Sequence, residues 1–193
     1  PVIDGVMASG GVGGGTGNGA GQISFSSNGV AIYLPGASSN GAARLVVVDR
    51  TGKTLYTHPE RRDFRSPRFS PDGKRIAVQF GDGRTNQVFV VDPDRGTTTK
   101  VTFDTSAGGS TPVWTPDGRH LAFTADQRGG LNISMTRSDG AGEPEVLTTG
   151  PGVAVPGSFS PDGARLAMVR QESGRMQLLV MCLPDKRLVP FRS

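Results

Sequence analysis

The stretch Phe69-Ser70-Pro71-Asp72-Gly73 returns as Trp114-Thr115-Pro116-Asp117-Gly118 and as Phe159-Ser160-Pro161-Asp162-Gly163, 45 residues apart each time. A weaker copy, Phe25-Ser26-Ser27-Asn28-Gly29, lies 44 residues before the first. Each copy precedes an apolar run, for example Ile76-Ala77-Val78. A period in the forties, filled with short strands and tight turns, is typical of a β-propeller with one blade per repeat. The sequence therefore predicts an all-β propeller fold.

The repeated tetrapeptide has the composition of a tight turn. Proline presets φ at the second position of the turn, and aspartate tolerates the backbone conformation required at the third. Glycine adopts the left-handed conformation at the fourth position, which closes the hairpin. The serine hydroxyl can bond back to the turn backbone. We therefore expect a purely structural role in the turns for Asp72, Gly73, Asp117, Gly118, Asp162 and Gly163.

One repeat supplies the four antiparallel strands of a blade. In the second repeat we expect strands at 67–69, 75–80, 87–92 and 99–102, joined by turns. The same template predicts a single propeller segment with blade 1 at 22–58, blade 2 at 59–103, blade 3 at 104–148 and blade 4 at 149–193. Residues 1–21 are expected to hold the outer strand of a preceding blade and a glycine-rich linker.

The four visible blades are expected to form an arc of a larger propeller, of roughly six to eight blades, although four blades can also close. The segment Pro1–Val6 looks like an outer strand, and the last repeat stops within another, at Phe191–Ser193. An open arc leaves apolar blade faces without neighbours. Self-association is the expected consequence.

The string aromatic-Ser-Pro-Asp-Gly-x-x-Ile/Leu-Ala resembles the TolB-like propeller repeat, a WD-like repeat. The resemblance covers 69–78, 114–123 and 159–168 well, whereas blade 1 departs from it with Ser27 for proline and Asn28 for aspartate. Such repeats occur in periplasmic TolB, in gating propellers of prolyl-oligopeptidase-type and tricorn-type peptidases, and in the extracytoplasmic part of some bacterial eukaryote-like Ser/Thr kinases. The resemblance implies a binding or sensing role and a periplasmic or extracytoplasmic location.

Composition and charge exclude several classes of protein. The net charge is +4, but the basic residues are scattered and form no contiguous stripe with aromatic partners, so we expect no nucleic-acid binding. Cations such as Arg75 and Arg165 follow the aspartate-glycine turns and suggest a solvated face. No apolar stretch approaches the ~18 residues of a membrane span. The single cysteine, Cys182, is expected to be a small buried hydrophobe.

The sequence offers no catalytic, cofactor or metal site. The two histidines, His58 and His120, lack the context of a nucleophile triad. A dinucleotide site would require a helix after the glycine-rich segment 15–20, but a strand is expected to follow it. Residues 51–54 are expected to form a hairpin turn. One aspartate per blade cannot converge on a calcium ion. We therefore expect this chain to be no enzyme and to bind no cofactor or metal.

A binding surface is expected where the loops are irregular. Successive hairpins alternate between two rims, so the repeated turns share one rim. The other rim is expected to carry the irregular loops, at 35–43, 59–65, 81–86, 104–110, 125–130, 150–155 and 171–174. Loops on a rigid scaffold are common binding sites. The most charged of them contains an aromatic residue that looks exposed, and its candidate partner-binding residues are Arg61, Arg62, Phe64 and Arg65. The alternative for this segment is an ordinary solvated loop.

These expectations favour a non-catalytic scaffold that binds a protein or peptide, for example as the sensor part of a bacterial Ser/Thr protein kinase. The alternative is the gating propeller of a prolyl-oligopeptidase- or tricorn-type serine peptidase whose catalytic domain lies elsewhere. The residues themselves do not decide between the two.

Overall fold

The computed structural model describes residues 22–35, 42–81, 85–102, 108–127 and 129–191. Blade 1 contains β1 (Ile23–Phe25), β2 (Ala31–Tyr33), β3 (Val46–Val48) and β4 (Thr54–Thr57). Blade 2 contains β5 (Arg65–Phe69), β6 (Ile76–Gly81), β7 (Asn86–Asp92) and β8 (Thr97–Lys100). Blade 3 contains β9 (Ser110–Trp114), β10 (His120–Gln127), β11 (Gly130–Arg137) and β12 (Glu145–Val146). Blade 4 contains β13 (Val153–Phe159), β14 (Arg165–Glu172), β15 (Arg175–Cys182) and β16 (Arg187–Pro190).

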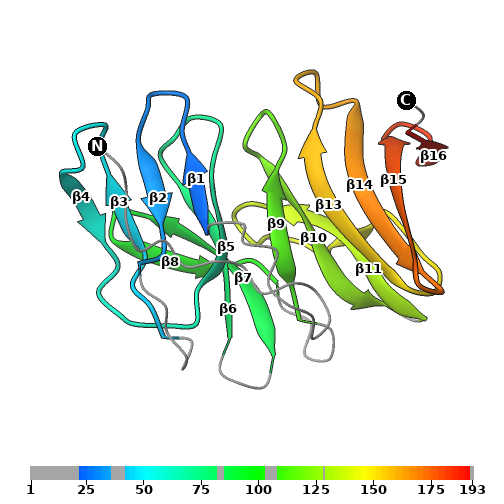
Figure 1. The fold of residues 1–193 in the computed structure, drawn as a ribbon, viewed down its shortest axis with the longest axis horizontal. Helices are drawn as coiled ribbons and strands as arrows, with labels where there is room; N and C mark the ends of the chain where they lie inside the picture. Colours follow the sequence, from blue (N-terminus) through cyan, green and yellow to red (C-terminus); the bar gives the residue numbers. More distant parts are fainter. Residues whose placement is uncertain (1–21, 36–41, 82–84, 103–107, 128, 192–193) are drawn as a thin grey trace.

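Within each blade the strands pair antiparallel in chain order, which confirms the propeller fold (Figure 1). A parallel pairing of Leu131 with Val153 also joins blade 3 to blade 4. The outer strand of blade 2 ends earlier than the sequence predicts, at Lys100, because the chain beyond it pairs differently. The Val88 amide donates to the Thr102 hydroxyl, 3.0 Å away, instead of to a backbone carbonyl.

The repeated turns share one hydrogen-bond pattern. In the turn of blade 3, the Thr115 hydroxyl donates to Asp117 Oδ1 (2.6 Å), and the same oxygen accepts the Arg119 amide (2.9 Å). Gly118 has φ of 67°, in the left-handed region that favours glycine. The turns of blades 2 and 4 repeat both bonds. The motif thus satisfies its own polar groups without any ligand.

Each pair of neighbouring blades encloses one hydrophobic core. Ile32 and Val47 of blade 1 meet Ile76 and Val78 of blade 2, and equivalent clusters lie between blades 2 and 3 and between blades 3 and 4. In blades 2, 3 and 4 the aromatic residue at the end of the innermost strand packs into the core shared with the preceding blade, as Trp114 does against blade 2. The cores therefore lie between sheets, and each blade depends on its neighbours for burial.

The four blades form an open arc, with blade 1 and blade 4 at opposite ends (Figure 1). The burial of equivalent residues shows the effect of this open end. The alanine of the second strand is fully buried in blades 2 and 3, as Ala77 and Ala122, but only half-buried in blade 4, as Ala167. The equivalent aromatic of blade 1, Phe25, is 68% exposed, while Trp114 is 7% exposed. Cys182 is half-buried rather than buried, because its strand lies in the last blade. Residues 1–21, including the predicted strand of a preceding blade, lie outside the described residues.

Two loops expected on the irregular rim are tight hairpins instead. The sequence predicts loops at 125–130 and 171–174, but β10 extends to Gln127 and β14 to Glu172. The turn between β14 and β15 consists of Ser173 and Gly174, with φ of 50° and 75°. Two successive positive φ values are those of a type I′ turn, whose twist matches that of the strands it joins.

Candidate binding site

The predicted arginine cluster lies on the rim opposite the repeated turns. Arg61, Arg62 and Arg65 are all exposed. Arg62 pairs with Glu60 (2.5 Å), and Arg65 pairs with Asp63 (2.9 Å). Exposed pairs of this kind contribute little to stability, so these arginines remain available to a partner.

Phe64 is not the exposed aromatic that the sequence suggests. Its side chain is fully buried in the core between blades 1 and 2. Its neighbours Asp63 and Arg65 point outward because side chains alternate along an extended segment. Phe64 therefore holds the arginine-bearing segment against blade 2 and cannot contact a partner directly.

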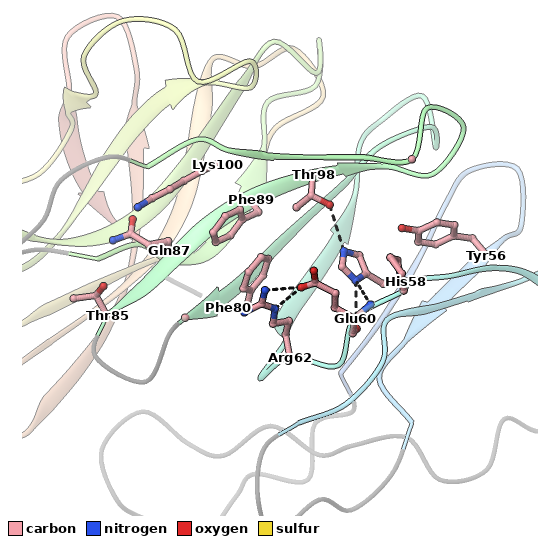
Figure 2. A pocket seen from close by; sticks show the side chains of 13 residues that line it. Tyr56, His58, Glu60, Arg62, Phe80, Thr85, Gln87, Phe89, Thr98 and Lys100 are labelled. Carbon is pink, nitrogen blue, oxygen red and sulfur yellow. Dashed lines mark hydrogen bonds and ion pairs between the residues drawn. The ribbon is translucent and has the colours of Figure 1, made fainter.

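A groove of about 540 Å³ lies beside this segment, between the outer parts of blades 1 and 2 (Figure 2). The described strands of the two blades differ in length: β2 and β3 have three residues each, whereas β6 and β7 have six and seven. Among the described residues, blade 1 leaves part of the blade 2 sheet uncovered. The groove's volume falls within the range of small-ligand and peptide-side-chain sites.

Five rings follow one another from one wall of the groove to its floor. Tyr56, His58 and Phe64 make edge-to-face contacts, and Phe64 continues to Phe80 with a centroid distance of 5.2 Å. Phe80 stacks on Phe89 at 3.8 Å with an interplanar angle of 12°. Partial burial raises the pKa of Tyr56 above its usual value, so its phenol stays protonated at neutral pH. The floor of the groove is thus aromatic and uncharged.

His58 is 5% exposed and is held by two hydrogen bonds. Its Nδ1 lies 3.2 Å from the Glu60 amide nitrogen and 3.3 Å from the Glu60 carbonyl oxygen, and its Nε2 lies 3.3 Å from the Thr98 hydroxyl. His58 fixes the path of the 58–62 segment beside the groove.

Charged side chains stand at both ends of the aromatic floor. Figure 2 shows the rings of Phe80 and Phe89 between Lys100 and the group formed by His58, Glu60 and Arg62. The Arg62 guanidinium also lies 5.8 Å from the Phe80 ring centroid. Lys100 and Arg62 are cations, and Glu60, the one anion of this group, is paired with Arg62. These three side chains therefore give the groove a net positive charge.

Other kinds of site are not seen in the described part of the chain. There, no three histidine, cysteine, aspartate or glutamate side chains gather so as to hold a metal ion. None of the described segments forms a helix of the length and apolarity that a membrane crossing needs. The turn aspartates Asp72, Asp117 and Asp162 are each engaged by their own turn.

Sequence reasoning identifies the arginines but not the groove. Phe80 and Phe89 come from neighbouring strands, and the alternation of β6 and β7 already places them on the same face. That signal is readable in the sequence. What the sequence does not supply is that blade 1, among the described residues, leaves this face uncovered.

The chain matches the TolB beta propeller domain family over residues 24–188. Among curated proteins it is 32% identical over 140 residues to the uncharacterized peptidase YuxL of Bacillus subtilis, covering 66% of this chain and 20% of that protein. It is 33% identical over 120 residues to the TolB homolog of Chlorobium luteolum, covering 61% of this chain and 26% of that protein. The chain thus spans about a quarter or less of either relative.

Among solved structures the chain resembles a putative TolB from Agrobacterium tumefaciens, with a TM-score of 0.76 and 19% sequence identity. The match covers 88% of this chain and 63% of that structure. At this identity the likeness shows the fold, which is the propeller derived above from the repeats.

Proposed function

The chain belongs to the TolB beta propeller domain family, and on that premise we propose that it is a non-catalytic scaffold that binds a protein or peptide partner through its irregular rim. The observation that carries this proposal is the combination of exposed arginines with an open aromatic groove at one place, between blades 1 and 2. Arginine and aromatic residues are the types most enriched at binding hot spots. The opposite rim consists of turns that bond to themselves.

A partner at this rim should be acidic or rich in hydrogen-bond acceptors, because Arg61, Arg62 and Arg65 present donors to it. Attraction between exposed charges is screened over a Debye length of about 8 Å at physiological ionic strength. Partner binding should therefore weaken as salt rises. The family resemblance also supports a periplasmic or otherwise extracytoplasmic location as part of the proposal.

The test compares two triple variants as baits in pull-downs from extracts of the source organism. Arg61, Arg62 and Arg65 are replaced with alanine in one, and Lys53, Lys74 and Arg119, exposed on the opposite rim, in the other. We expect the first variant to lose a partner that wild type and the second variant retain. Equal recovery of every partner by all three baits would contradict the proposal.

The second candidate function is a gating propeller attached to a serine peptidase domain. It is favoured by the similarity to a Bacillus subtilis protein described as a peptidase, of which this chain spans only a fifth. A third candidate, the sensor part of a bacterial Ser/Thr kinase, rests on the resemblance of the repeats alone. The sequence that adjoins this chain in its gene separates the three, because a Gly-x-Ser-x-Gly domain supports the peptidase and a kinase domain with a membrane span supports the sensor.

A further inference from the structure

We propose that the groove between blades 1 and 2 binds an extended acidic peptide segment, which inserts one aromatic or large aliphatic side chain against Phe89. This inference rests on the proposed function, because it names the class of ligand that the irregular rim receives. It is carried by three independent features of the groove: its floor, its charges and the free strand along its side.

The floor is apolar surface that a neighbouring blade normally covers. The inner part of the same blade 2 face, at Ile76, Val78 and Val91, is fully buried by blade 1. Phe89 continues this face outward and is only half-buried, and it already stacks on Phe80. Phe80 is 8% exposed, so another ring or a large aliphatic group would lie against the exposed part of Phe89 and gain burial there.

The charges favour an acidic ligand. Lys100 stands at one end of the rings and Arg62 at the other, with exposed Arg61 nearby in the chain. Glu60 is paired with Arg62, so its charge is already compensated. An acidic residue would therefore meet Lys100 at one end and the Arg62–Glu60 pair at the other, and the net positive charge favours acidic residues over basic ones.

The free strand favours an extended peptide over a compact ligand. β8 is the outermost strand of blade 2 and, among the described strands, pairs only with β7. Its residues Thr98 and Lys100 line the groove, and Thr97 to Thr99 are exposed and uncharged. An unprotected edge of this kind offers backbone donors and acceptors to an added strand.

The test measures fluorescence anisotropy of labelled peptides that carry one phenylalanine flanked by glutamates. Two comparison peptides carry alanine in place of the phenylalanine, or lysines in place of the glutamates. We expect binding of the first peptide to be at least about tenfold tighter than that of either comparison peptide. Equal binding of the three peptides, or no binding of the first, would overturn the inference.

The site is located with variants outside the arginine cluster. Lys100→Gln should weaken binding about threefold, while Lys74→Gln, on the opposite rim, should leave it unchanged. Phe89→Ala should abolish measurable binding, and Phe89→Leu, which keeps a large apolar side chain in the sheet, should weaken it about threefold. Binding unaffected by Lys100→Gln and Phe89→Leu would place the peptide elsewhere and overturn the inference.

The failure of this inference is distinguishable from failure of the proposed function. If the peptides do not bind but the arginine triple variant loses a partner in the pull-down, the groove is not the site and the rim still is. If the arginine triple variant retains every partner in the pull-down while Lys100→Gln and Phe89→Leu weaken peptide binding as expected, the groove binds peptides and the arginine cluster does not bind the captured partner.

Discussion

The guanidinium of Arg75 in blade 2 lies over the indole ring of Trp114 in blade 3, 4.9 Å from the ring centroid. The same guanidinium donates to the Gly118 carbonyl (2.8 Å) and to the Ser138 hydroxyl (3.1 Å), both in blade 3. The sequence suggests that the cations after the repeated turns form a solvated face. At Arg75 the cation instead connects two neighbouring blades.

Arg75→Ala should lower the free energy of unfolding by about 1–2 kcal/mol, because it removes a cation–π contact and two hydrogen bonds between blades. Urea unfolding followed by tryptophan fluorescence measures this directly, since Trp114 is the single tryptophan. Arg119→Ala is the matched control, because Arg119 is exposed in the neighbouring turn. Equal stability of Arg75→Ala and wild type would show that these contacts between blades contribute nothing.

Gly118→Val should destabilise the protein by more than ~1 kcal/mol, because a β-branched residue is strained at φ of 67°. Asp117→Ala should cost about 1 kcal/mol or less, as expected for the loss of an exposed turn hydrogen bond. Thermal unfolding of the two variants gives the order. If Asp117→Ala destabilised the protein more than Gly118→Val, strain at Gly118 would not be the main constraint on the turn. If Asp117→Ala abolished binding of a metal or ligand, the purely structural role of Asp117 would be wrong.

The turn aspartates predict a loss of stability in acid. A hydrogen bond from the preceding Ser or Thr hydroxyl is the main cause that holds the pKa of Asp72, Asp117 and Asp162 below the ordinary value of 3.8. A carboxyl whose pKa is lower in the folded state than in the unfolded state stabilises the fold at pH values above the pKa of the unfolded state. That stabilisation disappears as pH falls through the folded value, so unfolding should become easier from about pH 5 toward pH 2.

The measurement for this prediction is a series of urea unfolding curves across that acid range. Replacing the three aspartates with asparagine should flatten the dependence of unfolding free energy on pH below about 5. An equally steep dependence in the variant would assign acid sensitivity to other carboxyls. Asp139, whose pKa the adjacent Arg137 also lowers, is the first of these to examine.

Much of the fold can be predicted because each repeat carries the same local chemistry. The Ser-Pro-Asp-Gly turn needs only its own side chains, so residues such as Asp117 and Gly118 indicate it in any context. The outer strand of blade 2 is predicted to end at Thr102 but ends two residues earlier, at Lys100. The Thr102 hydroxyl accepts a hydrogen bond from the Val88 amide, and this contact depends on another strand. The expectation for Phe64 is wrong for a related reason: a run of charges surrounds it, and only the neighbouring blade decides which side chains turn inward.

The free face of blade 4 predicts self-association. Met176, Leu178 and Phe191 are 72%, 47% and 61% exposed, and Leu178 and Phe191 lie opposite each other across β15 and the end of β16. Multi-angle light scattering should show a mass that rises with concentration, because no described part of the chain covers this apolar face. Leu178→Lys should reduce the effect, whereas Val146→Lys on blade 3 should not. A clean monomer at high concentration would contradict the open arc.

Hydrogen exchange tests most directly whether the irregular rim is the binding surface. Backbone amide exchange is compared between the free chain and the chain bound to the partner that wild type captures and the arginine variant loses. We expect new protection in residues 58–65 and 85–89, and unchanged exchange in the repeated turns at 70–75, 115–120 and 160–165. Protection confined to the repeated turns, with no change beside the groove, would contradict this expectation.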